Sequence, residues 1–145
     1  MAESSGDGSM KQDSIFIFSE EQLKYKFNKD HPFNQLRLKL TLDLLQEVNA
    51  ISQEDIVLPR MATDEELQLV HDPSYVTAVR KAGRGELSED IAESYGLGTE
   101  DTPIFAGMHE ASALLVGGTL TAVDYVMEGK ARHALNLGGG LHHGF

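Results

Sequence analysis

The chain has 145 residues, 41% of them apolar, which is enough for one domain with its own hydrophobic core. Its formal net charge of -11 predicts a surface that repels nucleic-acid phosphates and anionic lipids, which argues against nucleic acid or membrane partners. The absence of cysteine excludes disulfides, thiolate metal sites and thiol nucleophiles, and is typical of a cytoplasmic protein.

The first part of the chain divides into a polar leader and a short strand. Residues 1–13 are rich in Ser, Gly and Asp and predict a disordered leader, with Met10 as an alternative natural start. Residues 14–18 are β-branched and aromatic apart from the first, which predicts a buried strand.

The next segment, 34–49, has leucines in two patterns. Alternate leucines are typical of a strand, but a second set of apolar residues recurs at intervals of four. This second set is Leu36, Leu40, Leu44 and Val48. The length of the segment and its content of Leu, Lys, Gln and Glu favour a helix. Residues 55–58 then predict a short strand that ends before a proline.

Two helix starts follow. Thr63 and Glu66 have the spacing of a capping box, which predicts a short helix to about Val70. Asp72, followed by proline, predicts the N-cap and first residue of another helix, which ends near Gly83.

The second half contains a long connection, a long helix and a strand. Residues 83–105 hold several glycines and acids and predict a functional or disordered loop. Residues 107–128 predict a helix, in which Gly117 and Gly118 indicate close packing against a neighbour. Residues 133–137 predict the last strand.

The order of these elements predicts the fold class and the place of the site. Strands that alternate with helices predict an α/β fold with a mainly parallel sheet. Ligands bind beyond the carboxyl ends of such strands, where three glycines at 138–140 precede His142 and His143. Glycine lets the backbone approach a ligand, and paired imidazoles suit general acid–base chemistry. The alternatives are an ordinary turn and surface histidines without a role.

Four segments of the chain resemble, in the family's order, signatures of the histone deacetylase superfamily. They are His31-Pro32 with Arg37, His71 with Tyr75, residues 100–105 and residues 135–143. The resemblance covers about residues 14–145 and is greatest for the bacterial acetoin-utilisation deacetylase branch. It implies the N-terminal portion of a three-layer α/β/α deacetylase domain with a mainly parallel sheet, incomplete in this chain.

The resemblance also implies roles for single residues. His142 matches the family's general base, His143 its partner, and Asp101 a rim carboxylate that accepts hydrogen bonds from the substrate backbone. The product channel is matched by Arg37, Gly138 and Gly139, and the substrate-binding loop by Gly140. The simpler alternatives are a solvated Asp101 and an Arg37 that pairs with an acid on its own helix. We assign no role to His71, Tyr75, His109 and His133.

The activity that the resemblance implies is zinc-dependent hydrolysis of acetyl-lysine amides on proteins, linked to acetoin and acetate metabolism, with an acyl-CoA synthetase as a candidate substrate. Alternatives are a deacetylase of polyamines or other small acetylamides, a non-catalytic fragment, and a generic α/β binding module. The family's zinc ligands and its carbonyl-polarising tyrosine follow the tandem histidines, and no residue here matches them. We therefore expect this chain alone to be inactive, to bind no catalytic Zn²⁺ and to be marginally stable; zinc or iron is left open as the native metal.

Overall fold

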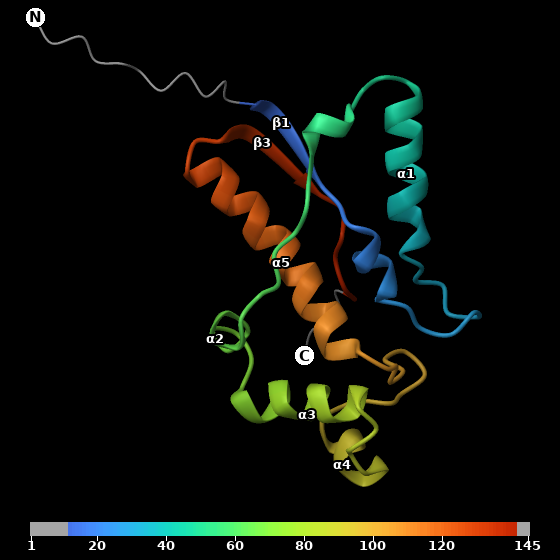
Figure 1. Cartoon of the computed structure of the whole chain (residues 1–145). Helices are drawn as coiled ribbons and strands as arrows, with labels where there is room; N and C mark the ends of the chain where they lie inside the picture. Colours follow the sequence, from blue (N-terminus) through green and yellow to red (C-terminus); the bar gives the residue numbers. More distant parts are fainter. Residues whose placement is uncertain (1–11, 142–145) are drawn as a thin grey trace, which may run out of the picture.

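The computed structural model describes residues 12–141, which form a small parallel sheet between two long helices, with shorter helices beyond one end of the sheet (Figure 1). The elements in chain order are β1 (Gln12–Ile17), η1 (Glu20–Lys24), α1 (Leu36–Glu47), η2 (Gln53–Asp55), β2 (Ile56–Val57), α2 (Asp64–Leu67), α3 (Pro73–Gly83), α4 (Glu89–Ser94), α5 (Met108–Met127) and β3 (Ala131–Asn136).

The sheet has the order β2-β1-β3, and both strand pairs are parallel. In the centre, Phe16 pairs with Ile56 on one side and with Leu135 on the other. The predicted α/β class and parallel sheet are therefore confirmed. β1 begins at Gln12, inside the predicted leader, because residues 12 and 13 continue the pairing with β3. The rest of that leader, residues 1–11, lies outside the described residues.

One face of the sheet is covered by α1. Phe16 and Phe18 of the first strand segment pack against Leu38 and Leu42 of the helix, and none of the four is more than 6% exposed. The predicted helix is confirmed, but the apolar residues spaced by four that helped to predict it are not its buried side. Those residues are Leu36, Leu40, Leu44 and Val48, between 50% and 63% exposed.

The opposite face is covered by α5. Ile15 and Ile17, which alternate with the phenylalanines along β1, pack with Ala131, and Ala122 and Tyr125 of α5 pack against this cluster. Alternate side chains of one strand thus bury themselves against different helices, as the pleat of a strand requires. The result is the expected three-layer α/β/α arrangement.

One flank of α5 is contacted by the connection that follows β2. A Cβ added to Gly117 would lie 1.7 Å from the carbonyl oxygen of Arg60, and one added to Gly118 would lie 3.0 Å from the side chain of Asn136. Only glycine at position 117 lets the two backbones come this close. The predicted close packing of the two glycines is confirmed.

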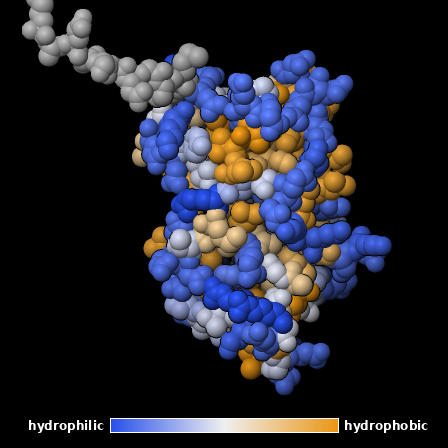
Figure 2. All heavy atoms as spheres, in the orientation of Figure 1, coloured by the Kyte–Doolittle hydropathy of each residue, from blue (hydrophilic) through white to orange (hydrophobic). Residues whose placement is uncertain are grey.

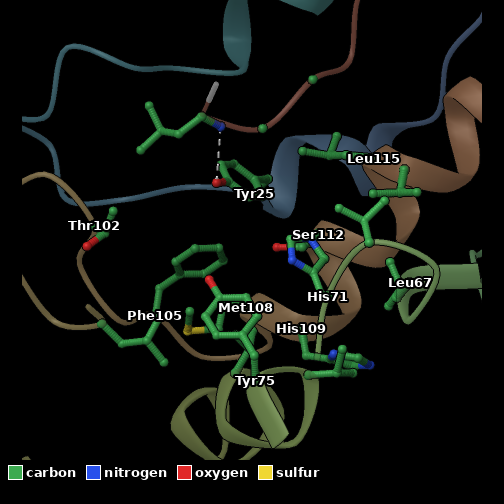
Figure 3. A pocket seen from close by; sticks show the side chains of 18 of the residues that line it. Tyr25, Leu67, His71, Tyr75, Thr102, Phe105, Met108, His109, Ser112 and Leu115 are labelled. Carbon is green, nitrogen blue, oxygen red and sulfur yellow. Dashed lines mark hydrogen bonds between the residues drawn. The ribbon is translucent and has the colours of Figure 1, made fainter. Parts of the chain in front are cut away.

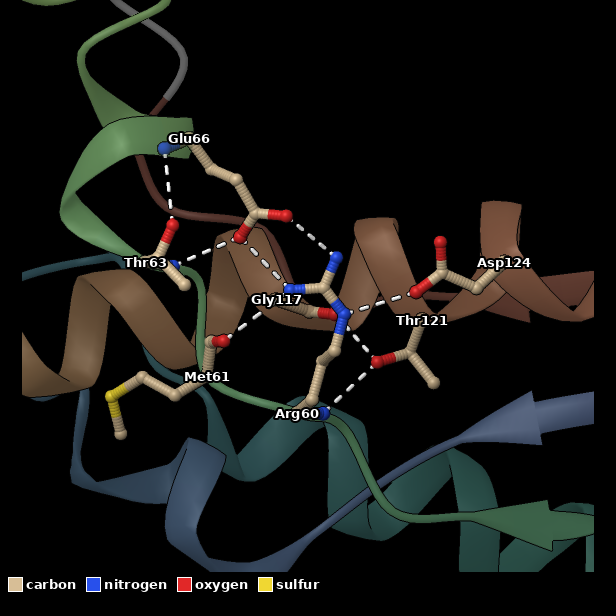
Figure 4. A network of polar contacts seen from close by, with 7 residues as sticks. All are labelled: Arg60, Met61, Thr63, Glu66, Gly117, Thr121 and Asp124. Carbon is tan, nitrogen blue, oxygen red and sulfur yellow. Dashed lines mark hydrogen bonds and ion pairs between the residues drawn. The ribbon is translucent and has the colours of Figure 1, made fainter.

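Polar contacts fix this connection to α5 (Figure 4). The Arg60 guanidinium donates to both carboxylate oxygens of Glu66, at 2.7 and 2.9 Å, and to Asp124 at 3.0 Å. Its hydrogen bonds hold the pKa of Glu66 down to about 2. Thr63 and Glu66 also form the predicted capping box, although the helix it starts ends at Leu67 rather than near Val70.

The long connection 83–105 is not the irregular loop predicted. It contains α4, and Ala92 and Leu97 pack with Ala82 of α3 and Met108 of α5 in one buried cluster. The helix has only six residues, which is too short for its apolar spacing to stand out in the sequence.

The surface on the face that Figure 2 shows is mainly polar, with its largest apolar areas in the upper half of the molecule, where α1 and the strands lie. The exposed apolar residues include Leu36, Leu40 and Leu44 of α1 and Leu135 of β3, which is 47% exposed. Within residues 12–141, no helix combines the length and apolar character required to cross a membrane.

Candidate functional site

A pocket of about 780 Å³ lies beyond the carboxyl ends of β1 and β3. Its walls come from the segment after β1, from α3, from the first half of α5, from residues in the 96–105 region and from Gly138–Leu141 after β3. Figure 3 shows Tyr25 on one side of this space and Tyr75 on the other. The pocket is thus where the fold class predicts a ligand site.

Gly138 turns the chain out of the sheet and toward the pocket. A Cβ at this position would lie 2.4 Å from the amide nitrogen of Gln22 and 3.3 Å from Oδ1 of Asn136. The Asn136 amide closes the turn, because its oxygen accepts from the Gly138 N–H and its nitrogen donates to the Gly138 carbonyl, both at 3.2 Å. A larger residue at position 138 would displace the buried Gln22, which is fully enclosed.

Two further side chains hold the loop that follows. Gln35, 2% exposed, donates from Nε2 to the carbonyl oxygen of Gly139 at 2.9 Å. The hydroxyl of Tyr25 accepts from the backbone N–H of Leu141 at 3.4 Å. Both come from the segment between β1 and α1, so residues more than a hundred positions apart fix the backbone at the pocket wall.

Aromatic rings surround Tyr25. Phe27, Phe33 and Phe105 meet its ring edge-on, with centroids between 5.4 and 5.8 Å away. Burial raises the pKa of the Tyr25 hydroxyl, so it is protonated at neutral pH. A Cβ on Gly140 would come within 3.4 Å of this hydroxyl, in ordinary contact. The wall is therefore apolar, with one phenol positioned against the glycine loop.

His31 joins the first motif to the predicted rim. Its Nδ1 accepts from the Phe33 backbone N–H at 3.1 Å, so its Nε2 carries the hydrogen and donates to the carbonyl oxygen of Asp101 at 3.3 Å. The Asp101 side chain is exposed, and the residues that follow it, Thr102 and Pro103, line the pocket. The carboxylate thus lies beside the pocket, in a loop that His31 contacts; its role in binding stays a prediction.

Arg37 lies behind the glycine loop and does not line the pocket. Its guanidinium stands over the Phe33 ring, 5.3 Å from the centroid, and donates to Oε1 of Gln35 at 3.4 Å. Among the ion pairs of the described residues it has no acidic partner on its own helix, which argues against the simpler alternative. A chain of contacts runs from the exposed Arg37 through Gln35 to Gly139. The channel stays a prediction.

The two predicted catalytic histidines, His142 and His143, lie outside the described residues. The preceding residue, Leu141, lines the pocket. Their roles as general base and partner therefore stay predictions.

Three residues that were assigned no role from the sequence line the pocket. His71 and Tyr75 have ring centroids 5.3 Å apart, and His109 lies beside them (Figure 3). Nε2 of His109 accepts from Arg80 at 3.0 Å, and burial together with Arg80 lowers the pKa of His109, so the ring is neutral with its hydrogen on Nδ1. The spacing of His71 and Tyr75 was visible in the sequence, whereas nothing in it marked His109. His133 does not line this pocket.

The described residues do not fit a zinc ion. Within residues 12–141 no group of three or more His, Cys, Asp or Glu side chains is arranged to hold a metal. Zinc sites use three or four such ligands. Any metal at this pocket would need ligands from beyond that part of the chain.

Residues 31–145 match the family model of the histone deacetylase domain. This chain belongs to that family. The resemblance inferred from four short motifs is thereby confirmed.

Curated relatives extend the match almost to the whole chain. It is 62% identical, over 134 residues, to the acetoin utilization protein AcuC of Bacillus subtilis (strain 168). The matched region covers 92% of this chain and 35% of the relative. It is 50% identical over 130 residues to the protein of the same name from Staphylococcus aureus (strain MSSA476), with 90% and 33% covered. The chain thus spans about a third of the length of these relatives and corresponds to their N-terminal portion.

Solved structures support the fold. An HDAC homolog complexed with SAHA superposes with a TM-score of 0.81 at 30% identity, over 92% of this chain and 36% of that one. An HDAC homolog from Aquifex aeolicus gives a TM-score of 0.80 at the same identity and coverage. The HD domain of HDA15, at 20% identity and a TM-score of 0.67, shares the fold.

Proposed function

We propose that this chain forms one wall of the substrate pocket, and carries the tandem histidines, of a deacetylase that hydrolyses acetyl-lysine amides on proteins in acetoin and acetate metabolism. The observation that carries the proposal is the glycine loop after β3. Gln35 and Tyr25 bind its backbone at Gly139 and Leu141, and the loop lines the pocket immediately before His142.

The loop has a physical task in this proposal. A general base acts within hydrogen-bond reach of its target, so the backbone that carries it has to be held in place. Gln35 and Tyr25 supply that support from a segment packed into the core. His142 then takes a proton from the attacking water, and His143 supports or protonates the leaving group.

The metal belongs to a different part of the domain. The described residues do not fit zinc. We therefore assign the zinc ligands to the region that follows the matched portion in the relatives, and we assign to this chain the pocket wall and the proton-transfer residues. This division implies that the chain alone does not hydrolyse acetyl-lysine.

The rim favours a peptide substrate. Asp101 is exposed beside the pocket, and one carboxylate can accept two backbone N–H groups of an extended peptide. An acetylated protein in the cytoplasm is thus the proposed partner, with an acyl-CoA synthetase as a candidate. A second candidate is a cationic acetylated polyamine, which the net charge of -11 would attract.

A chimera tests the function. This chain replaces the matched N-terminal portion of the Bacillus subtilis relative, and the purified protein is assayed with an acetyl-lysine peptide and with an acetylpolyamine. We expect peptide deacetylation that a chelator removes, that Zn²⁺ or Fe²⁺ restores, and that His142→Ala reduces by at least about 100-fold, as expected for a general base.

The matched control is Lys81→Ala, an exposed residue outside the pocket lining, which should leave the rate unchanged. A folded chimera that hydrolyses neither substrate, or one in which His142→Ala keeps full activity, would contradict the proposal. Activity on the acetylpolyamine alone would select the second candidate.

A further inference from the structure

His31 lies in a closed loop between η1 and α1. Lys26 and Asn34 form an isolated antiparallel bridge, which brings the two ends of this loop together. Inside the loop, the backbone N–H of His31 donates to the carbonyl oxygen of Asn28 at 3.3 Å. The backbone that carries the imidazole is therefore itself fixed by hydrogen bonds.

The ring of His31 is held in one orientation. Its Nδ1 accepts from the Phe33 backbone N–H at 3.1 Å, and the ring packs on Phe27 with centroids 4.5 Å apart. Phe27 in turn packs in the aromatic cluster around Tyr25. Because Nδ1 is an acceptor, Nε2 carries the hydrogen and is the donor of the ring.

The rim loop, residues 98–102, is bonded mainly to itself. The backbone N–H of Thr102 donates to Oγ1 of Thr99 at 3.0 Å, which closes the loop locally. Among the described residues, one hydrogen bond joins this loop to a segment distant in the sequence. It is the bond that the carbonyl oxygen of Asp101 accepts from Nε2 of His31, at 3.3 Å.

We propose that His31 is a positioning residue for peptide substrates, because its hydrogen bond to the Asp101 carbonyl holds the rim loop where the Asp101 carboxylate meets the substrate backbone. The Asp101 side chain is exposed, so burial does not hold it in place. A bond to the carbonyl of the same residue restricts its backbone, and a binding group that is held in advance loses less entropy when the ligand binds. The substrate part of this inference rests on the proposed function, whereas the anchoring of the rim loop does not.

Two substitutions separate the two hydrogen bonds of the ring. Asparagine places its amide near the position of Nδ1, so His31→Asn keeps an acceptor for the Phe33 N–H. Asn28 already accepts in this way from the N–H of Asp30, at 3.1 Å. The asparagine side chain is too short to reach Asp101. Glutamine places its amide near the position of Nε2, so His31→Gln keeps a donor for the Asp101 carbonyl.

Steady-state kinetics of the chimera with the Bacillus subtilis relative test the substrate part. With an acetyl-lysine peptide, we expect His31→Asn to raise KM about fivefold, the effect of one neutral hydrogen bond, and to leave kcat within about twofold. With an acetylpolyamine, which has no peptide backbone for Asp101 to bind, neither constant should change. His31→Gln should restore the KM for the peptide to within about twofold of the unmodified chimera.

Hydrogen exchange of this chain alone, followed by NMR, tests the anchor without any activity. The N–H of Gly98 donates to the carbonyl oxygen of Thr102 at 3.0 Å, so the protection of these two amides reports closure of the rim loop. We expect both to exchange about fivefold faster in His31→Asn, and at nearly the unmodified rate in His31→Gln.

Unchanged protection in His31→Asn would overturn the proposal, because the loop would then be held without His31. A KM that rises by the same factor for the acetylpolyamine as for the peptide would also overturn it, since the damage would not concern the substrate backbone. An inactive chimera together with the expected exchange result would support the anchor and count against the proposed function only.

Discussion

The two long helices of this domain, α1 and α5, cover opposite faces of one sheet but differ in what contacts them away from the sheet. One flank of α5 is contacted by the connection after β2, whose backbone lies directly on Gly117, whereas Val116 and Val123 of the same helix are exposed. α1 instead presents a row of exposed leucines. A glycine in a helix costs stability by itself, so Gly117 indicates a contact already made by the backbone. Large apolar residues on a second face indicate a contact that side chains have still to make.

The difference also concerns polar bonding. The Arg60 network of hydrogen bonds and ion pairs ties one flank of α5 to α2. On α1, the one ion pair among the described residues joins two residues of the helix itself, Lys39 and Asp43. Because exposed pairs within a helix contribute little, α1 depends on its apolar contacts.

The largest effect on stability is expected from Gly117→Ala. The new methyl group would overlap the Arg60 carbonyl, a backbone atom that cannot move alone. We expect a loss of about 4 kcal/mol in the free energy of unfolding, or failure to fold, from this overpacking. Urea unfolding followed by circular dichroism measures it.

Gly118→Ala is the control for that experiment. Its Cβ would meet only the end of the Asn136 side chain, at 3.0 Å, and alanine improves helix propensity by about 1 kcal/mol. We expect a change within about 1 kcal/mol. Equal effects of the two substitutions would contradict the close backbone contact at Gly117.

The two faces of α1 are compared with Leu38→Ala and Leu40→Ala. Leu38 is 2% exposed, and its loss should cost about 3 kcal/mol because it leaves a cavity against Phe16. Leu40 is 60% exposed, and its loss should change stability by less than about 0.5 kcal/mol. The same urea unfolding experiment applies. A large cost at Leu40 in the isolated chain would mean that its outer face is already covered.

A small, pH-dependent effect is expected from Glu66→Gln, which weakens the network on α5. The pKa of Glu66 falls from an ordinary 4.5 to about 2 in the folded protein, mainly through its hydrogen bonds with Arg60. A lowered pKa stabilises the fold above pH 4.5, and this contribution disappears as the pH falls through about 2. The urea midpoints of the unmodified chain and the variant should therefore differ at pH 6 and converge toward pH 2.

Glu65→Gln is the matched control. Glu65 is the neighbouring carboxylate on the same short helix, and it has no ion pair among the described residues. Its effect should be smaller than that of Glu66→Gln at pH 6. The urea midpoints of the Glu66 variant and the unmodified chain should not differ by a constant amount from pH 6 to pH 2.5. A constant difference would rule out the ion pair as its source.

The sequence predicted the main elements because their signals are local. The capping box at Thr63 and the N-cap at Asp72 act within a few residues of themselves. The family was also predictable, because four short motifs in a fixed order are improbable by chance. α4 was missed because six residues give too weak a period, and its Ala92 is buried in a cluster with residues of α3 and α5.

The site was less predictable than the fold. Asp101 and the glycines were found through motifs, and the structure places the glycines in the pocket wall and Asp101 beside it. Gln22 and Gln35 carried no signal, since glutamine is usually an exposed residue and only the fold encloses these two. His109 also carried no signal in the sequence, and only the fold places it in the pocket wall.

By itself, then, the sequence determined the α/β class, the order of the strands and of the helices other than α4, the family and the candidate catalytic loop, since each is written in local spacing or in short motifs. Only the tertiary structure decided which leucines of α1 are buried, which side chains hold the glycine loop, and which histidines line the pocket. Those outcomes depend on contacts between residues as far apart as Gln35 and Gly139, and no local pattern records which distant groups will meet.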